Sequence, residues 1–136
     1  METAIAYIYR FVLYVFFGLT LEMVFSVIGI ERSLCYHLKR RVPRKYLEGF
    51  VSLYMIPLHG VGVLFLFEPF RVAISGWFIG LRFLAYAVLI SLMEMAWGWF
   101  LEKVVGFYPW DYYAESKYRV FKRGYTLWTL VPQWGI

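Results

Sequence analysis

The sequence predicts an all-α integral membrane protein: a helical bundle with three full spans and a short or truncated fourth. The 136 residues are 62% hydrophobic and only 17% charged, with a mean hydropathy of +0.61, which is too apolar for a soluble domain. Three apolar runs, residues 11–30, 50–67 and 72–101, are each long enough to cross about 30 Å of hydrocarbon as a helix.

The chain also repeats itself. Five residues recur at an offset of 72 (82 − 10): Arg10, Phe11, Tyr14, Glu22 and Met23 return as Arg82, Phe83, Tyr86, Glu94 and Met95. Three more recur at an offset of 75 (124 − 49): Gly49, Pro57 and Gly60 return as Gly124, Pro132 and Gly135. We therefore expect one membrane domain, residues 1–136, made of two tandem parallel helical-hairpin repeats, at about 4–68 and 72–136.

The first repeat contains two spans of different regularity. Residues 4–30 predict an unbroken helix. Residues 49–67 predict a second span with Pro57 near its middle, where proline removes an amide donor and strains the preceding turn. We expect this span to be kinked or locally unwound, and residues 68–71 to form the turn outside the membrane.

The second repeat begins with a long span and ends with a short one. Residues 72–101 exceed the roughly 20 residues that a span needs, so this helix is expected to tilt or to project. Gly76 and Gly80 form a GxxxG pattern, which weakly indicates close helix packing. Residues 125–136 match the start of span two but reach only about 18 Å as a helix. We expect a longer protein or, as the less favoured alternative, a half-span held by surrounding protein.

The basic residues predict the orientation. They gather in residues 31–49 and 103–124, whereas the turn after the second span carries only Arg71. By the positive-inside rule both loops are cytoplasmic and the N-terminus is outside. The basic charge flanks spans and forms no separate module, so no nucleic-acid partner is expected. The expected partners are membrane lipids and other membrane subunits, or further copies of the chain.

Polar residues that recur inside apolar helices are the first candidates for function, because they cost stability there. The candidate intramembrane site consists of Glu22, Glu94, Arg10, Arg82, Tyr14, Tyr86 and His59. Arg10 and Glu22 are twelve residues apart (22 − 10), too far to pair within one helix, and the same holds in the second repeat. Glu22 and Glu94 are expected to face each other across a pseudo-twofold axis, which suits proton coupling or cation binding because neighbouring carboxylates resist double ionisation.

Each of these residues also has a structural alternative. The glutamates can accept hydrogen bonds that fix the bundle. The arginines can snorkel to the interface or pair with a glutamate of another helix. His59 can be a hydrogen-bonded packing residue at the kink, and its counterpart in the second repeat is Trp134, so the histidine is not duplicated.

A second candidate site is the cytoplasmic loop motif Trp110, Asp111 and Tyr112. Asp111 is the only aspartate of the chain and lies in a basic loop. We expect it to cap a short helix or to pair with Arg119, Lys122 or Arg123, in preference to contacting a substrate or partner.

Recognisable catalytic and cofactor motifs are absent. The sequence has no P-loop, HExxH, GxSxG or paired-cysteine motif, and Cys35 is its single cysteine. No cofactor and no metal site are expected, and a non-enzymatic role is favoured over catalysis.

Several segments together resemble a known family pattern. Residues 49–60, Gly-Phe-Val-Ser-Leu-Tyr-Met-Ile-Pro-Leu-His-Gly, are similar to its glycine, Ser-Leu-Trp and proline signature. Glu94 with residues 101–103, Leu-Glu-Lys, and the Trp-Asp-Tyr motif resemble its most specific segment, and Pro132 and Trp134 resemble its last. The pattern is similar to that of the bacterial "putative ABC-transporter type IV" or CmpB-like membrane proteins and of the related vertebrate transmembrane protein 229 family. The resemblance implies four membrane helices and says little about chemistry.

The expected function is a small multi-pass, transporter-like or permease-like subunit with a polar intramembrane site. One alternative is a non-catalytic membrane scaffold or accessory subunit of a larger complex. Another is an intramembrane lipid-modifying enzyme that acts through Glu22 and Glu94.

Overall fold

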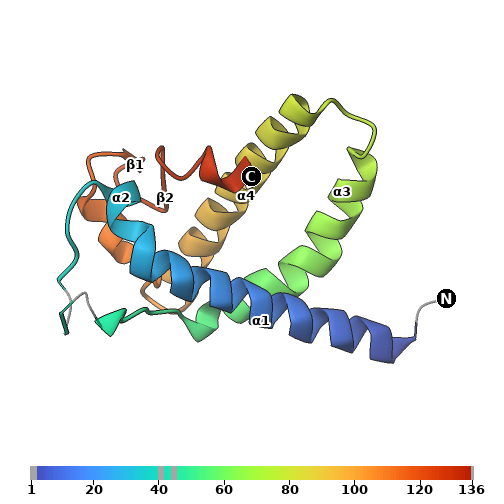
Figure 1. Cartoon of the computed structure of the whole chain (residues 1–136), viewed down its shortest axis with the longest axis horizontal. Helices are drawn as coiled ribbons and strands as arrows, with labels where there is room; N and C mark the ends of the chain where they lie inside the picture. Colours follow the sequence, from blue (N-terminus) through green and yellow to red (C-terminus); the bar gives the residue numbers. More distant parts are fainter. Residues whose placement is uncertain (1–2, 40–41, 44–45, 136) are drawn as a thin grey trace. The chain divides into compact units, whose positions relative to one another are not determined.

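The computed structural model describes residues 3–39, 42–43 and 46–135, and the chain is built mainly of helices (Figure 1). The elements are α1 (Ala4–Ile28), α2 (Ile30–Leu34), η2 (Leu53–Met55), η3 (Leu58–Phe67), α3 (Glu68–Ala73), α4 (Ile79–Val104), η4 (Asp111–Glu115), β1 (Arg119–Val120), β2 (Thr126–Leu127) and η5 (Gln133–Gly135). Of these, η3 is a π-helix, and η2, η4 and η5 are short 3₁₀ turns.

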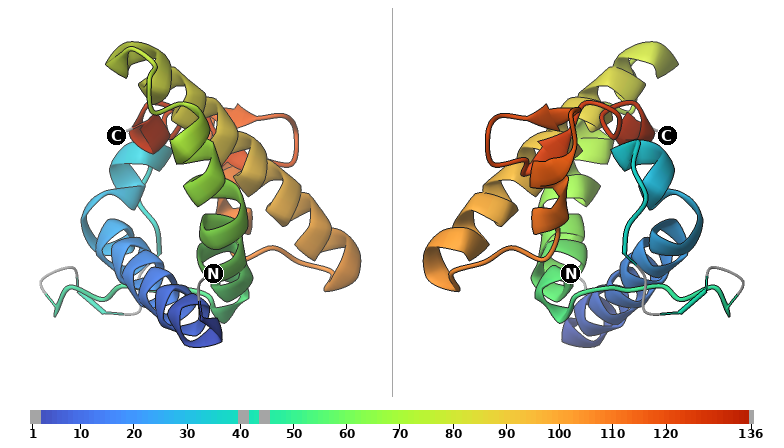
Figure 2. Two further views of the ribbon diagram at one scale, coloured as in Figure 1. Left: turned by 90° about the vertical axis from the view of Figure 1, so that its right-hand side faces the viewer. Right: turned by 90° about the vertical axis from the view of Figure 1, so that its left-hand side faces the viewer.

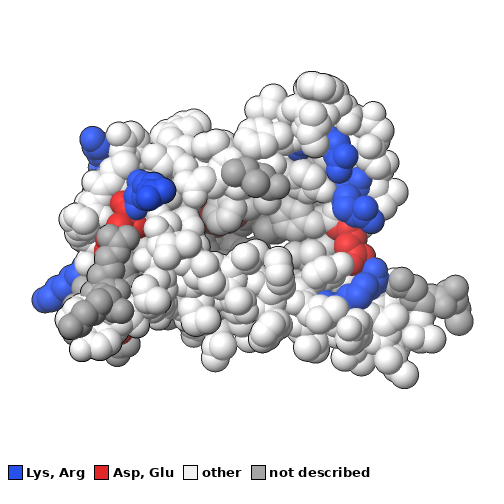
Figure 3. Space-filling view, viewed as in Figure 1, with Lys and Arg blue, Asp and Glu red and all other residues white. Residues whose placement is uncertain are grey.

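Within the described residues, three helical segments are long and apolar enough to cross a membrane: Ala4–Ile28, Leu53–Ala73 and Ile79–Val104. Large apolar side chains on them, such as Phe16 and Phe65, are mostly exposed. Figure 3 shows charged side chains in a few small groups, separated by wide areas of uncharged residues. Water solvates such an apolar surface poorly, whereas the hydrocarbon chains of lipids solvate it well. The chain is therefore a helical membrane protein, as the sequence predicts.

Two compact units make up the chain. The first contains α1, η2, η3 and α3, and the second contains α2, α4 and the elements that follow α4. Each unit packs one long helix against elements from later in its own sequence: α1 contacts η3, and α4 contacts η5 and β2.

In the first unit, α1 begins after Thr3, whose side chain accepts a hydrogen bond from the Ala6 amide. Large apolar side chains occur all around this helix, so hydrophobicity alone does not select the face that packs. That face is marked by small and polar residues. Gly18 and Ser26 are its buried residues, and Phe11 lies directly against Gly60 of η3. Close approach of two helices at glycine is a common packing solution in membranes.

The second span of this unit is irregular after Pro57, as predicted. The ten residues of η3 take π geometry, in which hydrogen bonds close five residues apart. The predicted start at Gly49 is wrong, because Ser52 caps η2 at Leu53. The predicted turn at residues 68–71 is also wrong, because Glu68–Ala73 is helical. Pro69 lies in the first turn of α3, a position where a missing N–H does not break the helix.

In the second unit, one face of α4 is buried. Its buried residues are spaced three or four apart, as expected for one helix face: Ala87, Ser91, Glu94, Gly98 and Leu101. Strands β1 and β2 pair antiparallel, with Arg119 opposite Leu127 and Val120 opposite Thr126. Figure 2 shows this hairpin beside α4 from two sides.

Two expectations for the second repeat are corrected. The third span begins at Ile79 rather than residue 72, and Gly76 lies in the connection, where a Cβ would meet nothing within 4 Å. The GxxxG pattern therefore does not pack helices. Residues 125–135 form β2, turns and η5 instead of a continuous helix. This segment is held to α2 by side-chain hydrogen bonds in place of a helical ladder: Thr129 Oγ1 donates to Ser33 O at 2.5 Å, and Gln133 Nε2 donates to Ser33 Oγ at 2.9 Å.

Part of the predicted basic loop, Arg40, Arg41, Arg44 and Lys45, lies outside the described residues, as does Ile136. The orientation of the loops and the bounds of the two repeats remain predictions.

Candidate functional site

The polar residues of the first unit lie at four-residue intervals along α1. These residues and the glycine among them are Arg10, Tyr14, Gly18, Glu22 and Ser26. A four-residue spacing keeps side chains near one face of a helix. Each of them contacts the segment that precedes or forms the second span.

Glu22, the fourth residue of this row, forms a hydrogen-bonded pair with His59 of the second span. Glu22 Oε1 lies 2.9 Å from His59 Nε2. The two side chains are 27% and 20% exposed, so both are mostly enclosed by protein. A Cβ on Gly18 would lie 2.3 Å from Cγ and Nδ1 of the His59 ring. Gly18 therefore provides the space that the imidazole occupies, one helical turn before Glu22.

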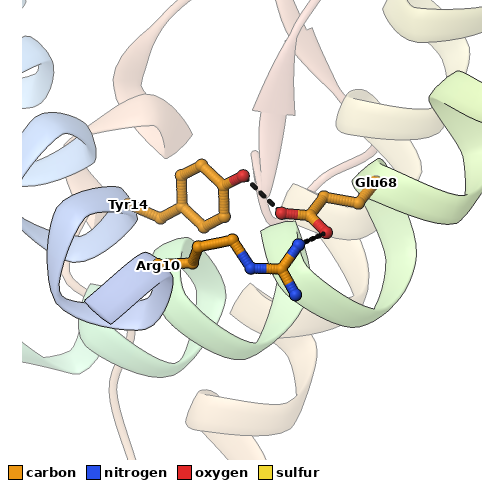
Figure 4. A network of polar contacts seen from close by, with 3 residues as sticks. All are labelled: Arg10, Tyr14 and Glu68. Atoms are coloured by element: carbon orange, nitrogen blue, oxygen red, sulfur yellow. Dashed lines mark hydrogen bonds and ion pairs between the residues drawn. The ribbon is translucent and has the colours of Figure 1, made fainter. Parts of the chain in front are cut away.

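Nearer the start of α1, Glu68 binds two residues of this helix at once (Figure 4). Arg10 Nη1 lies 2.6 Å from Glu68 Oε2, and Tyr14 Oη donates a hydrogen bond to Glu68 Oε1. Arg10 Cζ also lies 5.0 Å from the centre of the Tyr7 ring. Of the two structural alternatives for Arg10, the structure shows the ion pair with a glutamate of another helix. Glu68 was not among the predicted site residues, because the sequence was interpreted as a turn there.

In the second unit, Glu94 is 7% exposed and accepts a hydrogen bond from Trp134 Nε1 at 3.3 Å. Trp134 is the residue that corresponds to His59, so the second unit binds the equivalent glutamate with a donor that cannot titrate near neutral pH. The predicted facing of Glu22 and Glu94 would join the two units, and it remains a prediction.

Arg82 and Tyr86 are one turn apart on α4, in the positions that correspond to Arg10 and Tyr14. Arg82 Nε is buried and makes no hydrogen bond to any described residue. The ion-pair partner that Arg10 finds in Glu68 has no counterpart for Arg82 in the part of the chain that the structure describes.

The Trp-Asp-Tyr motif has mainly structural contacts. Trp110 is buried, and its Nε1 donates to Tyr125 O at 2.7 Å. Tyr112 O accepts from Tyr36 Oη at 2.5 Å. Asp111 is exposed and is the first residue of η4.

The expected contacts of Asp111 are not found among the described residues. The N-cap residue of η4 is Trp110, so Asp111 does not cap this turn. Arg123 pairs instead with Glu102, at 3.1 Å. Glu102, Asp111, Lys122 and Arg123 line an open hollow of about 670 Å³ with four neighbours. The mixed charges of its lining favour neither a purely anionic nor a purely cationic ligand.

Tyr108 lies beside this motif and makes the stability of the second unit sensitive to pH in the alkaline range. Burial, aided by the negative charges of Asp111 and Glu102, raises the pKa of Tyr108 from 10.0 to about 12. The folded state thus holds the phenol proton more tightly than the unfolded chain does. The tighter binding of this proton contributes to the free energy of unfolding. The contribution is complete below pH 10 and is lost as the pH rises through 12.

We expect the unfolding temperature in detergent to fall between pH 10 and 12, and to fall less steeply for Tyr108→Phe. At neutral pH this variant should be less stable by about 1 kcal/mol, because it loses the hydrogen bond to Arg123 O. Tyr118→Phe, a tyrosine of the same unit, is the matched control. An identical alkaline slope for wild type and Tyr108→Phe would contradict the assignment.

The described residues contain no group of three His, Cys, Asp or Glu side chains that could hold a metal ion. What the first unit offers chemically is a carboxylate and an imidazole in direct contact inside membrane-length helices. One imidazole nitrogen of His59 lies within hydrogen-bond distance of a Glu22 carboxylate oxygen, which is the geometry that proton transfer between two groups requires.

Comparison with curated proteins and with solved structures gives no significant match. One family described as "Putative ABC-transporter type IV" matches residues 9–136, which include most of α1, the second span, α4 and the Trp-Asp-Tyr motif. The relationship to the vertebrate transmembrane protein 229 family remains a prediction. The chain therefore belongs to the putative ABC-transporter type IV family of membrane proteins.

Proposed function

We propose that this protein is a transporter-like or permease-like membrane subunit in which Glu22 and His59 bind and release a proton or a small cation. The observation that carries the proposal is the 2.9 Å contact between the two side chains inside membrane-length segments. The family's description as transporter-related agrees with such a role.

The loss of stability expected from placing Glu22 and His59 inside membrane helices supports a functional role for the pair. An ionisable group inside a membrane helix destabilises the protein, and such groups commonly mark ion or proton pathways. In the second unit Trp134, a neutral donor, forms the equivalent hydrogen bond to Glu94. A neutral side chain is therefore sufficient to bind a glutamate at this position. The first unit nevertheless has a titratable side chain, His59, there.

The local backbone supports the same role. His59 is the second residue of the π-helix η3, so it lies at the start of the irregular part of the second span. Its Nε2 atom faces Glu22, while its Cγ and Nδ1 atoms pack closely against Gly18 of α1, so the ring is held in place beside the carboxylate. The sequence has no nucleotide-binding motif, so an ion gradient or another subunit would supply the energy.

The test is proton flux into liposomes that contain the purified protein, driven by an imposed membrane potential and followed with an enclosed pH-sensitive dye. We expect Glu22→Gln and His59→Gln each to lower the flux by about tenfold or more, because either change removes one member of the proton-exchanging pair. Glu115→Gln, an exposed glutamate in η4, is the control and should have no effect. Absence of flux in the wild type, or flux unaffected by both changes, would refute the proposal.

Gly18→Ala tests the geometry without altering either titratable group. The added Cβ would overlap the His59 ring and force it away from Glu22. We expect flux to fall as in His59→Gln, while Gly76→Ala, which meets nothing within 4 Å, keeps wild-type flux. Normal flux in a folded Gly18→Ala protein would mean that the contact between Glu22 and His59 is not used.

A further inference from the structure

We propose that the hollow at the end of α4 binds the headgroup of a zwitterionic phospholipid, with Lys122 contacting its phosphate and Asp111 its primary ammonium group. The site lies entirely in the second unit and does not depend on transport through Glu22 and His59. The proposal rests on the walls of the hollow, on the two charges that remain without a partner in it, and on its place at the end of a membrane-length helix.

Three short segments form the walls of the hollow, and contacts between them hold these walls in place. Gly106 has a left-handed conformation with φ of +91°, which ends α4 and directs the chain away from the helix. Tyr108 Oη then donates a hydrogen bond to Arg123 O at 2.5 Å, between the segment after α4 and the turn that joins β1 to β2. A Cβ on Gly124 would lie only 2.8 Å from Ala114 N, so the backbones of these two segments are in close contact. The hollow of about 670 Å³ is therefore formed before any ligand binds, which lowers the cost of binding.

The lining of the hollow contains two carboxylates and two cations, and one of each is already paired. Glu102 Oε1 lies 3.1 Å from Arg123 Nη1, and the same carboxylate accepts a hydrogen bond from Tyr125 Oη. Asp111 and Lys122 are exposed, and neither forms an ion pair with any residue that the structure describes. The hollow therefore presents one carboxylate and one ammonium group that are available to a ligand.

A ligand that carries both a phosphate and a primary ammonium group is complementary to this pair. A purely anionic ligand would be repelled by Asp111 and Glu102, and a purely cationic one by Lys122 and Arg123. A lysine binds phosphate as a point charge, and a carboxylate accepts hydrogen bonds from an N–H donor. Ethanolamine supplies such a donor, whereas the quaternary nitrogen of choline has none and is bound by cages of aromatic rings. The pair therefore fits a phosphoethanolamine headgroup.

The surroundings of the hollow indicate that this headgroup belongs to a membrane lipid. The 26 residues of α4 extend about 39 Å, so the end that carries Glu102 reaches past about 30 Å of hydrocarbon into the headgroup layer. Exposed apolar side chains lie beside the charged ones: Phe107 lines the hollow and is 46% exposed, and Phe121 precedes Lys122 and is 73% exposed. Acyl chains would cover such rings better than water does. A soluble phosphoethanolamine would leave them uncovered.

The test is native mass spectrometry of the purified full chain in neutral detergent. Phosphatidylethanolamine, phosphatidylcholine or phosphatidylglycerol with identical acyl chains is added over a range of concentrations. We expect one saturable phosphatidylethanolamine adduct, bound about tenfold or more tightly than either other lipid, because only this headgroup matches both charges. Lys122→Gln should weaken its binding about tenfold, and Asp111→Asn should remove the preference over phosphatidylcholine. Lys117→Gln and Glu115→Gln, which remove exposed charges of the same unit outside the lining, are the matched controls and should bind as the wild type does.

A further arm distinguishes a lipid from a soluble ligand. Glycerophosphoethanolamine, the headgroup without acyl chains, should displace the lipid only at concentrations about a hundredfold higher or more, because it covers no apolar surface. Displacement at equal concentrations would contradict the assignment to a lipid. Equal affinity for phosphatidylethanolamine and phosphatidylcholine would show that Asp111 does not bind the ammonium group. Tighter binding of phosphatidylglycerol would show a simple anion site, and absence of any saturable adduct would overturn the proposal as a whole.

Discussion

Replacing Gly60 with alanine is expected to destabilise the protein by about 2–3 kcal/mol, because the added methyl group overpacks a close contact. A Cβ at this position would lie 2.1 Å from Phe11 Cε2 and within 2.7 Å of two further atoms of the same ring. The Phe11 ring would have to shift to admit the methyl group, which disturbs the contact between α1 and η3. The measurement is the free energy of unfolding in detergent, followed by tryptophan fluorescence or circular dichroism.

The chain supplies a matched control for this change. Gly76→Ala introduces the same methyl group where nothing lies within 4 Å, so stability should change little. Gly135→Ala tests the equivalent contact in the second unit, where the Cβ would lie 2.7 Å from the Phe83 ring and 2.8 Å from Phe83 O. It should destabilise as Gly60→Ala does. Similar stability of the Gly60→Ala and Gly76→Ala proteins would contradict the close packing of α1 on η3.

Glu68→Gln is expected to lower stability by about 2 kcal/mol, because it removes the anionic partner of a part-buried arginine. The Arg10–Glu68 contact is 2.6 Å, and the two side chains are 27% and 25% exposed, so the effect should be smaller than for a fully buried pair. Arg10→Gln should cost a similar amount. The double variant should cost less than the sum of the single changes, because each single change leaves one charge without its partner.

Arg82→Gln is the control for that experiment. It removes the equivalent arginine from the equivalent helix, but no described carboxylate pairs with Arg82. We expect the purified chain to be unchanged or slightly more stable, since the change removes a cation that no described carboxylate neutralises. Additive costs for Arg10→Gln and Glu68→Gln would show that the contact contributes no coupling energy.

Composition and hydropathy were sufficient to predict the class of fold, because a bilayer leaves few options for a chain with three long apolar runs. The first helix was placed within two residues of its observed end, Ile28 against a predicted Ile30. The predicted ends of the second span and of α4 are less accurate. There the sequence predicts a turn at residues 68–71, although proline in the first turn of a helix is tolerated.

The polar residues on α1 could be found from the sequence, because charges and tyrosines stand out in an apolar run and their spacing predicts one face. Their partners could not. Pairing Arg10 with Glu68 requires the geometry of the second span, and pairing Glu94 with Trp134 requires a folded segment that is not the predicted helix. Gly18 lies in the same four-residue spacing as the polar residues of α1, and this pattern indicates where a bulky side chain such as that of His59 can pack.

The π geometry of η3 sets the rotational phase between the two polar contacts of the first unit. His59 and Glu68 are nine residues apart (68 − 59), which in an α-helix is two and a half turns and would place them on opposite faces. With hydrogen bonds that close five residues apart, the same nine residues make about two turns, so both side chains reach α1. A change of η3 from π to α geometry would thus rotate one of the two residues away from α1 while the other stayed. The number of residues per turn in η3 thus determines whether the Glu22–His59 pair and the Arg10–Glu68 ion pair can form at the same time.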